Sequence, residues 1–163
     1  MRVAIITSSD TGALGLREDK SGPLIQEIVE RLGGQVVTYI LLPDERERLA
    51  RTMAKIADDG KADLILTTGG TGFSPRDCMP EATLEVVQRQ VPGIPEAMRA
   101  YSMKLTGRAM LSRAMAGIRE RTLIVNLPGS PKAVGEILEY IYPQLIHGVK
   151  VLKGLATDCA RKD

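Results

Sequence analysis

The chain has 163 residues, of which 44% are hydrophobic and 26% are charged, and it carries a formal net charge of +2. This balance is typical of a globular protein and excludes disordered, collagenous and coiled-coil chains. The basic residues form no block, and one Phe and four Tyr supply all the aromatic side chains, so we expect no nucleic-acid partner. The length predicts a single domain over residues 1–163.

Cysteine, histidine and apolar residues exclude three further classes of protein. Cys78 and Cys159 lie far apart without a CxxC spacing, and His147 is the only histidine, so neither a disulfide framework nor a structural zinc site is expected. The N-terminal apolar segment is too short for a signal peptide, and no segment reaches the roughly 18 apolar residues that span a bilayer. We therefore expect a cytoplasmic protein that makes no membrane contact.

Strands and helices alternate in the first part of the chain. Apolar segments at residues 3–6, 36–42 and 64–66 are typical of strands buried on both faces. The helical spacing of the apolar residues between them predicts two helices, the first ending at Gly33-Gly34 and the second following Asp44 as a candidate cap, with Glu47 completing a capping box. This order predicts a three-layer αβα domain, an α/β fold with a mostly parallel sheet and helices on both faces.

The second part of the chain predicts further helices and a hairpin. One helix opens at Pro80-Glu81-Ala82 and another begins near Pro95. Residues 108–125 read as a loop and then a hairpin that turns at residues 119–121. The last strand leads into a long helix, which Pro143 is predicted to kink or divide.

The predicted strands end in loops that could bind an anion, because ligands of open parallel sheets gather at the carboxyl ends of the strands. Gly69, Gly70 and Gly72 can bring consecutive N–H groups onto a phosphate, and Thr71 adds a hydroxyl. The segment is neither a Walker A loop nor a dinucleotide fingerprint. The turn Pro128-Gly129-Ser130-Pro131 opens a helix and offers a second anion site.

Each of these features also has an ordinary structural explanation. A glycine-rich connection is more often only a turn, and Asp44 or Asp77 alone is more often a helix cap than a catalytic group. Their coincidence at one sheet edge favours a site for a small phosphorylated ligand with Mg²⁺. Cys78 lies beside Asp77 but has no histidine near it in sequence, which argues against a thiol nucleophile.

The sequence resembles the MogA/MoaB family of molybdenum cofactor biosynthesis proteins. The resemblance is carried by Thr67-Thr68-Gly69-Gly70-Thr71-Gly72, with Asp77 five residues later and Pro80-Glu81-Ala82 close behind. Residues 8–10, 19–22, 43–44, 111–113 and 126–132 match the family in the same order. The fold that this resemblance implies is the MogA/MoaB-like α/β domain.

The resemblance implies a molybdopterin adenylyltransferase, which transfers the AMP part of Mg-ATP to the phosphate of molybdopterin and releases pyrophosphate. We expect Asp44 and Asp77 to be catalytic and to hold Mg²⁺ at the nucleotide phosphates. Ser112 and the turn at residues 128–131 are expected on the pterin side. The residues expected to bind phosphate or substrate are Ser8, Ser9, Asp10, Thr68, Gly69, Gly70, Thr71, Gly72, Glu81, Ser112, Pro128, Gly129, Ser130 and Pro131.

The family also implies partners and leaves one rival function. Its members usually form trimers, sometimes paired into hexamers, and apolar residues between Leu145 and Leu155 add to the expectation of a homotrimer. The adenylylated product would pass to a molybdate insertion protein of the MoeA type. The alternative is a MoaB-like carrier that binds molybdopterin without turnover. A dinucleotide-binding oxidoreductase is disfavoured because residues 8–12 lack the glycine fingerprint.

Overall fold

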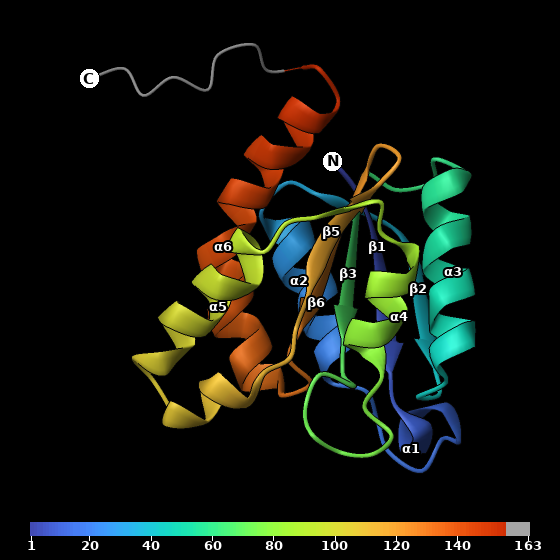
Figure 1. Cartoon of the computed structure of the whole chain (residues 1–163), viewed down its shortest axis with the longest axis vertical. Helices are drawn as coiled ribbons and strands as arrows, with labels where there is room; N and C mark the ends of the chain where they lie inside the picture. The colour runs from blue at the N-terminus through green and yellow to red at the C-terminus, as the bar shows by residue number, and fades with distance from the viewer. Residues whose placement is uncertain (156–163) are drawn as a thin grey trace.

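The computed structural model describes residues 1–155, which form a six-stranded sheet in the order β2-β1-β3-β6-β5-β4 (Figure 1). The strands β2, β1, β3 and β6 are parallel, whereas β5 is antiparallel to β6 and β4 is antiparallel to β5. The strands are β1 (Arg2–Ser8), β2 (Gln35–Leu42), β3 (Leu64–Thr68), β4 (Arg89–Gln90), β5 (Ala116–Arg119) and β6 (Thr122–Leu127). The prediction of a mostly parallel sheet is confirmed.

Helices cover both faces of this sheet, so the three-layer prediction is also confirmed (Figure 1). Val3 and Ile5 of β1 lie in the core beneath α2, α5 and α6, and Ala4 and Ile6 lie in the core beneath α3 and α4. Successive side chains of a strand point to opposite faces, which is why β1 is apolar at all four residues from Val3 to Ile6. The helices are α1 (Asp10–Ala13), α2 (Ser21–Arg31), α3 (Arg46–Asp58), α4 (Met79–Val86), α5 (Gly93–Met103), the 3₁₀ helix η1 (Gly107–Leu111) and α6 (Pro131–Leu152).

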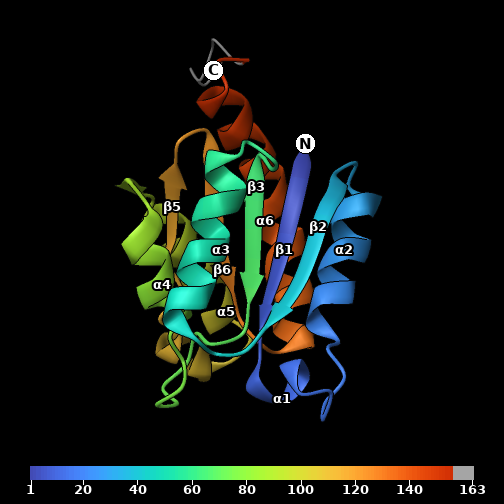
Figure 2. The ribbon, with the colours of Figure 1, turned by 90° about the vertical axis from the view of Figure 1, so that its right-hand side faces the viewer.

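The carboxyl ends of the parallel strands meet at one edge of the sheet. Figure 2 shows the arrowheads of β1, β2 and β3 at this edge, with α1 beside them. The loops that follow β1, β2, β3 and β6 therefore converge there. The predicted hairpin is present as β5 and β6, with Glu120 in the left-handed region at φ 50°.

Two local predictions are wrong. The N-cap of α3 is Glu45 and makes no side-chain cap, so Asp44 caps no helix and the capping box with Glu47 does not form. The predicted division at Pro143 does not occur, because α6 continues through it as one helix. Buried Tyr142 and Leu145 fix the helix on both sides of the proline, and this packing offsets the lost backbone hydrogen bond.

Within residues 1–155, no helix combines the length and the apolar character needed to cross a membrane.

Candidate active site

Hydrogen bonds between distant segments join the loops at the carboxyl edge. The Thr68 hydroxyl donates to the carbonyl oxygen of Pro128 over 2.6 Å, and the Ser21 hydroxyl donates to that of Gly129 over 2.9 Å. The turn at residues 128–131 is thereby fixed between the end of β3 and the start of α2. Thr68, expected to bind substrate, uses its hydroxyl proton to hold this turn.

Asp44 and Asp10 hold each other by reciprocal hydrogen bonds. The backbone N–H of Asp10 donates to Asp44 Oδ2 over 3.0 Å, and the backbone N–H of Asp44 donates to Asp10 Oδ1 over 2.9 Å. The Ser8 hydroxyl donates to the other oxygen of Asp44, Oδ1, over 2.5 Å. These bonds orient the Asp44 carboxylate at the end of β2.

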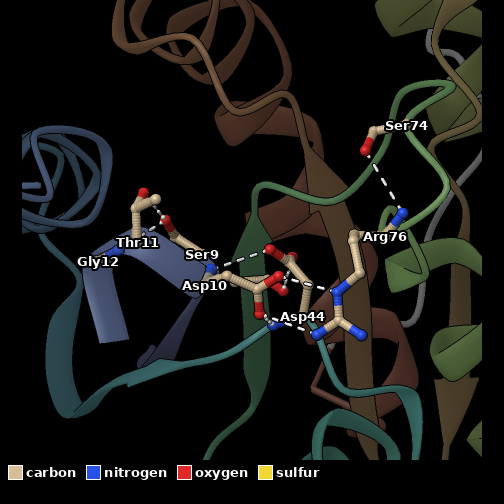
Figure 3. Close-up of polar contacts among 8 residues, drawn as sticks. Ser9, Asp10, Thr11, Gly12, Asp44, Ser74 and Arg76 are labelled. Carbon is tan, nitrogen blue, oxygen red and sulfur yellow. Dashed lines mark hydrogen bonds and ion pairs between the residues drawn. The ribbon is translucent and has the colours of Figure 1, made fainter. Parts of the chain in front are cut away.

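Arg76 supplies a positive charge to this pair. Its Nε and Nη2 donate to the two oxygens of Asp10 over 2.9 and 3.0 Å (Figure 3). The hydrogen bond from Arg76, aided by the backbone amide of Asp44, holds the pKa of Asp10 below its usual range. Asp10 is therefore ionised at neutral pH and is occupied by an ion pair.

The connection between β3 and α4, residues 69–78, is called the glycine loop. Its glycines lie close to both predicted catalytic carboxylates. Gly69 and Gly70 have φ of 90° and 63°, a region that favours glycine. A Cβ on Gly70 would lie 3.2 Å from Asp44 Oδ1, and one on Gly72 would lie 2.9 Å from Asp77 Oδ2. Asp44 and Asp77 therefore approach the same short loop at two points.

Asp77 is held by its own loop. Its Oδ2 accepts a hydrogen bond from the backbone N–H of Ser74 over 3.0 Å. The N-cap of α4 is Cys78, which makes no side-chain cap, so Asp77 does not cap that helix. Helix capping, the ordinary structural explanation for an aspartate at such a position, therefore applies to neither Asp44 nor Asp77.

Two cavities open at this edge, and the predicted substrate residues divide between them. The larger, about 760 Å³, is lined by polar groups, and its charged residues are Arg17 and Lys20 with Glu18 and Asp19 between them in sequence. The predicted residues that line it are Ser8, Ser9, Thr68, Gly69, Gly129, Ser130 and Pro131. The smaller, about 280 Å³, has apolar walls that include Met98 and Ile137. The predicted residues that line it are Thr71, Gly72, Ser112 and Pro128.

Sequence reasoning missed the basic residues of the large cavity. Arg17 and Lys20 lie between α1 and α2, in a connection that carries no phosphate motif. Two observations could have identified them. Both residues follow β1, which ends at the edge where ligands bind, and Lys20 lies in the segment 19–22 that matches the family. Ser9, which was predicted, lines the same cavity while its hydroxyl caps α1 by accepting from the Gly12 N–H.

Asp19 also lines the large cavity and lies one residue before Lys20, the N-cap of α2. It accepts hydrogen bonds from the backbone N–H groups of Ser21 and Gly22 and from the Tyr39 hydroxyl. Burial alone would raise the pKa of Asp19, but these hydrogen bonds hold it below its usual range. Burial, followed by the hydrogen bond and charge of Asp19, raises the pKa of Tyr39 to about 12. This pair fixes the start of α2 at the cavity wall.

Glu81 lies away from both cavity linings and forms an ion pair with Arg113. Arg113 also donates from Nε to the carbonyl oxygen of Gly72 over 2.6 Å and from Nη2 to that of Asp77 over 2.8 Å. Glu81, expected to bind substrate, thus contacts the arginine that holds the glycine loop.

Residues 1–155 contain no group of three or more His, Cys, Asp or Glu side chains placed to hold a metal ion. Mg²⁺ differs from most protein-bound metals because it takes one or two carboxylates and completes its shell with water and phosphate oxygens. The oriented carboxylate of Asp44 beside the glycine loop, with Asp77 at the far end of that loop, fits this requirement. These two residues would hold Mg²⁺ only together with a bound phosphate.

Glycine-rich loops and oriented carboxylates at the carboxyl ends of parallel strands are typical of α/β proteins that bind phosphorylated small molecules there. The fold and site of this chain are of that class. The chain belongs, over residues 4–147, to the family described as the probable molybdopterin binding domain.

Individual relatives agree with this family. The chain is 40% identical to the molybdopterin adenylyltransferase of Helicobacter pylori, over 94% of this chain and 89% of the relative. It is 36% identical to the molybdopterin adenylyltransferase of Escherichia coli, over 91% of this chain and 80% of the relative. The crystal structure of the molybdopterin biosynthesis enzyme MoaB from Thermus thermophilus superposes with a TM-score of 0.87 at 46% identity, covering 94% and 96% of the two chains.

Proposed function

We propose that this chain is a molybdopterin adenylyltransferase, an enzyme of molybdenum cofactor biosynthesis. It transfers the AMP part of ATP to the terminal phosphate of molybdopterin and releases pyrophosphate. Two relatives that bear this name align over more than nine-tenths of the chain. The structural observation that carries the proposal is the pair of cavities that share the glycine loop, with a carboxylate at each end of that loop.

We assign the nucleotide to the large cavity and the pterin to the small one. Arg17 and Lys20 supply positive charge for a triphosphate, and the Ser130 turn offers N–H groups at the start of α6. The apolar walls of the small cavity suit the flat pterin ring, and Ser112 offers it a hydroxyl. This assignment keeps Ser112 on the pterin side and moves residues 129–131 to the nucleotide side.

The reaction joins two polyanions, so the protein must offset negative charge. A terminal phosphate oxygen of molybdopterin attacks the α-phosphorus of ATP, and the bond to the pyrophosphate oxygen breaks. Mg²⁺, when bound, would neutralise part of the charge on the phosphates. The Ser8 hydroxyl and the Asp10 N–H orient Asp44, and the Ser74 N–H orients Asp77, before substrate arrives.

A covalent route through Cys78 is unfavourable. Burial, followed by the Asp44 charge, raises the pKa of the Cys78 thiol, so the reactive thiolate is scarce at neutral pH. The mechanism therefore uses direct attack of one substrate on the other.

Pyrophosphate release tests the proposed function. Purified protein with Mg-ATP and molybdopterin should release pyrophosphate with turnover, and omission of the pterin should abolish it. The rival carrier, which the names of the relatives do not favour, would bind molybdopterin tightly and release none. That result would overturn the enzyme proposal.

We further propose that the protein is a homotrimer, in some conditions paired into a hexamer, and that a MoeA-type protein accepts its product. Part of the sequence argument for a trimer is weaker than expected, because Leu145 and Val149 are buried in the chain's own core. Val151 and Leu155 remain exposed.

A further inference from the structure

The glycine loop after β3 has little structure of its own to hold its shape. Its hydrogen bonds join Ser74 to Arg76 and Asp77 and, at its base, Gly70 to Met79, while its tip is open to solvent, with Phe73 69% exposed. A loop with several glycines loses much conformational freedom when it is ordered. The bonds to Ser74 orient Asp77 within the loop, and contacts with residues outside the loop are needed to place the loop itself.

Arg113, in the connection between η1 and β5, contacts the loop on both sides of its tip. Its backbone N–H donates to the carbonyl oxygen of Thr71 over 3.0 Å, and its Nε donates to that of Gly72 over 2.6 Å. Its Nη2 donates to the carbonyl oxygen of Asp77 over 2.8 Å. The planar guanidinium of Arg113 thus bridges Gly72 and Asp77 across the tip of the loop. Two other contacts hold the loop elsewhere: the Met79 N–H donates to the carbonyl oxygen of Gly70, and Arg76 pairs with Asp10.

The hydrogen bonds of Arg113 are arranged to hold the loop and do not form the strongest possible ion pair with Glu81. A guanidinium and a carboxylate pair most strongly when both oxygens are used. Arg113 contacts only Oε1 of Glu81, while Oε2 is buried without a hydrogen-bond partner among the described residues. The remaining donors go to loop carbonyl oxygens, which every loop sequence would provide.

We propose that Arg113 is a positioning residue of the adenylyl-transfer site, which holds Asp77 in place relative to Gly72 of the glycine loop. This inference rests on the proposed function. Arg113 contacts no reacting atom in this scheme and acts through the backbone of Gly72 and Asp77. Displacing a catalytic group by about 1 Å can lower a rate by roughly 100-fold, so a loosened loop has a large effect on turnover.

Arg113→Lys tests the proposal because it keeps the charge and removes the planar fork. We expect amide hydrogen exchange in residues 69–78 to accelerate at least tenfold. We expect kcat to fall by between about 10-fold and 100-fold, while KM for each substrate changes by less than about threefold. The hydrogen-exchange readout needs no substrate, so it is independent of whether the wild-type enzyme releases pyrophosphate.

Arg119→Lys is the matched control. Arg119 also joins a carboxylate, that of Asp58, to a backbone carbonyl oxygen, that of Val86, but it does so away from the glycine loop. It should lower the melting temperature without changing exchange in residues 69–78 or kcat. Equal effects of the two substitutions on kcat and on loop exchange would show a general structural role and overturn the proposal. If residues 69–78 of the Arg113→Lys variant exchange their amide hydrogens at the wild-type rate, the proposal is also overturned.

A double variant covers the case in which Arg113→Lys does not fold. Arg113→Gln with Glu81→Gln removes both partners of the ion pair and leaves no unpaired charge. The same acceleration of exchange in residues 69–78 is expected, and exchange at the wild-type rate would contradict the proposal.

Discussion

Asp44 and Asp77 hold their positions through hydrogen bonds to loop residues, and neither carboxylate caps a helix. Asp44 accepts from Ser8 and Asp10, and Asp77 accepts from Ser74. A hydrogen bond of this kind needs only an acceptor oxygen, whereas a metal ion needs negative charge. Replacing Asp77 by asparagine therefore separates the two roles, because only Oδ2 of Asp77 accepts a hydrogen bond from the described residues. Asp44 accepts on both oxygens, so asparagine there also disturbs a hydrogen bond.

Asp77→Asn should leave the melting temperature within about 1–2 °C of wild type, since the amide oxygen can still accept from Ser74. Molybdopterin binding should persist, and turnover should fall on the order of 100-fold, the size typical of losing one electrostatic group. Pyrophosphate release at saturating Mg-ATP measures this. Asp58→Asn, far from the glycine loop, is the control. A variant with near wild-type turnover would remove Asp77 from the mechanism. In Asp44→Asn the single amide oxygen replaces two acceptors, so its melting temperature must be measured alongside its turnover.

Gly70→Ala should weaken ligand binding more than folding. Its φ of 63° costs an alanine about 1 kcal/mol, and the new Cβ would crowd Asp44 at 3.2 Å. Gly60→Ala is a close control, with a φ of 61° and nothing within 4 Å of the added Cβ. Both variants should lose similar thermal stability. Only Gly70→Ala should lose molybdopterin or nucleotide affinity, by about tenfold or more in a titration, and retention of wild-type affinity would exclude the cradle role.

At the scale of elements, a buried carboxylate joins three of them at the edge opposite the cavities. Asp63, just before β3, accepts from the Arg2 backbone N–H and side chain on β1 and from Lys153 after α6. Burial alone would raise the pKa of Asp63, but Arg2 and Lys153 hold it well below its usual range. A carboxyl group with a lowered pKa stabilises the fold above its unfolded pKa of about 3.9, and this stabilisation disappears as the pH falls below that value.

Asp63→Asn should therefore destabilise the protein at neutral pH but not in acid. We expect a loss of about 2 kcal/mol at pH 7, which corresponds to a melting temperature lower by roughly 4–8 °C. Between pH 5 and pH 2 the wild type should lose more stability than the variant, so the two melting curves should converge. Calorimetry across this range measures the difference, and a gap that stays constant with pH would contradict the linkage.

Apolar segments predicted β1, β2, β3 and β6, and the reason given for them, burial on both faces, holds for β1, β3 and β6. It is wrong for β2, which lies at the edge of the sheet and leaves Val37 and Tyr39 exposed. The elements that sequence did not predict depend on distant contacts. The four-residue α1 is held by the Asp10–Asp44 pair, whose members are 34 residues apart, and the two-residue β4 forms through its pairing with β5. No local pattern encodes either one.

The candidate site was predictable to a similar extent. Glycines, hydroxyls and aspartates after successive strands marked the edge where ligands bind. The division into two cavities was not predictable, nor were the contacts of Arg76 with Asp10 and of Arg113 with Asp77, which link residues 66 and 36 apart. Such pairs leave no periodic signal in one sequence.

At the scale of the molecule, all the strands of residues 1–155 share a single sheet, and we infer that residues 1–163 form one domain. The surface of this domain includes an apolar region around α5 and η1. Met103, Leu105, Met110 and Leu111 are exposed there. Tyr140 of α6 stacks on Tyr101 of α5, with ring centroids 4.4 Å apart, and is itself 49% exposed. An exposed apolar region of this kind favours contact with another protein surface.

Light scattering on purified protein at micromolar concentration should give a mass of three times 17.7 kDa or, where trimers pair, six times that value. Tyr140→Asp, which places a charge in the apolar region, should shift the protein toward the monomer if the region lies in the subunit interface. Glu27→Lys, which changes the charge at an exposed residue of α2, is the control and should leave the mass unchanged. A wild-type mass of a single chain would refute the trimer.

Pro128 lines the small cavity and Gly129 lines the large one, so the partition between the two is one polypeptide backbone thick. Thr68 and Ser21 hold this turn, so a ligand in one cavity meets a wall whose position also shapes the other cavity. Any shift of the turn on binding of one substrate therefore changes the affinity for the other. Because such coupling is reciprocal, the factor by which the pterin changes nucleotide affinity equals the factor by which the nucleotide changes pterin affinity. A shared wall thus links the two binding steps that must both occur before adenylyl transfer.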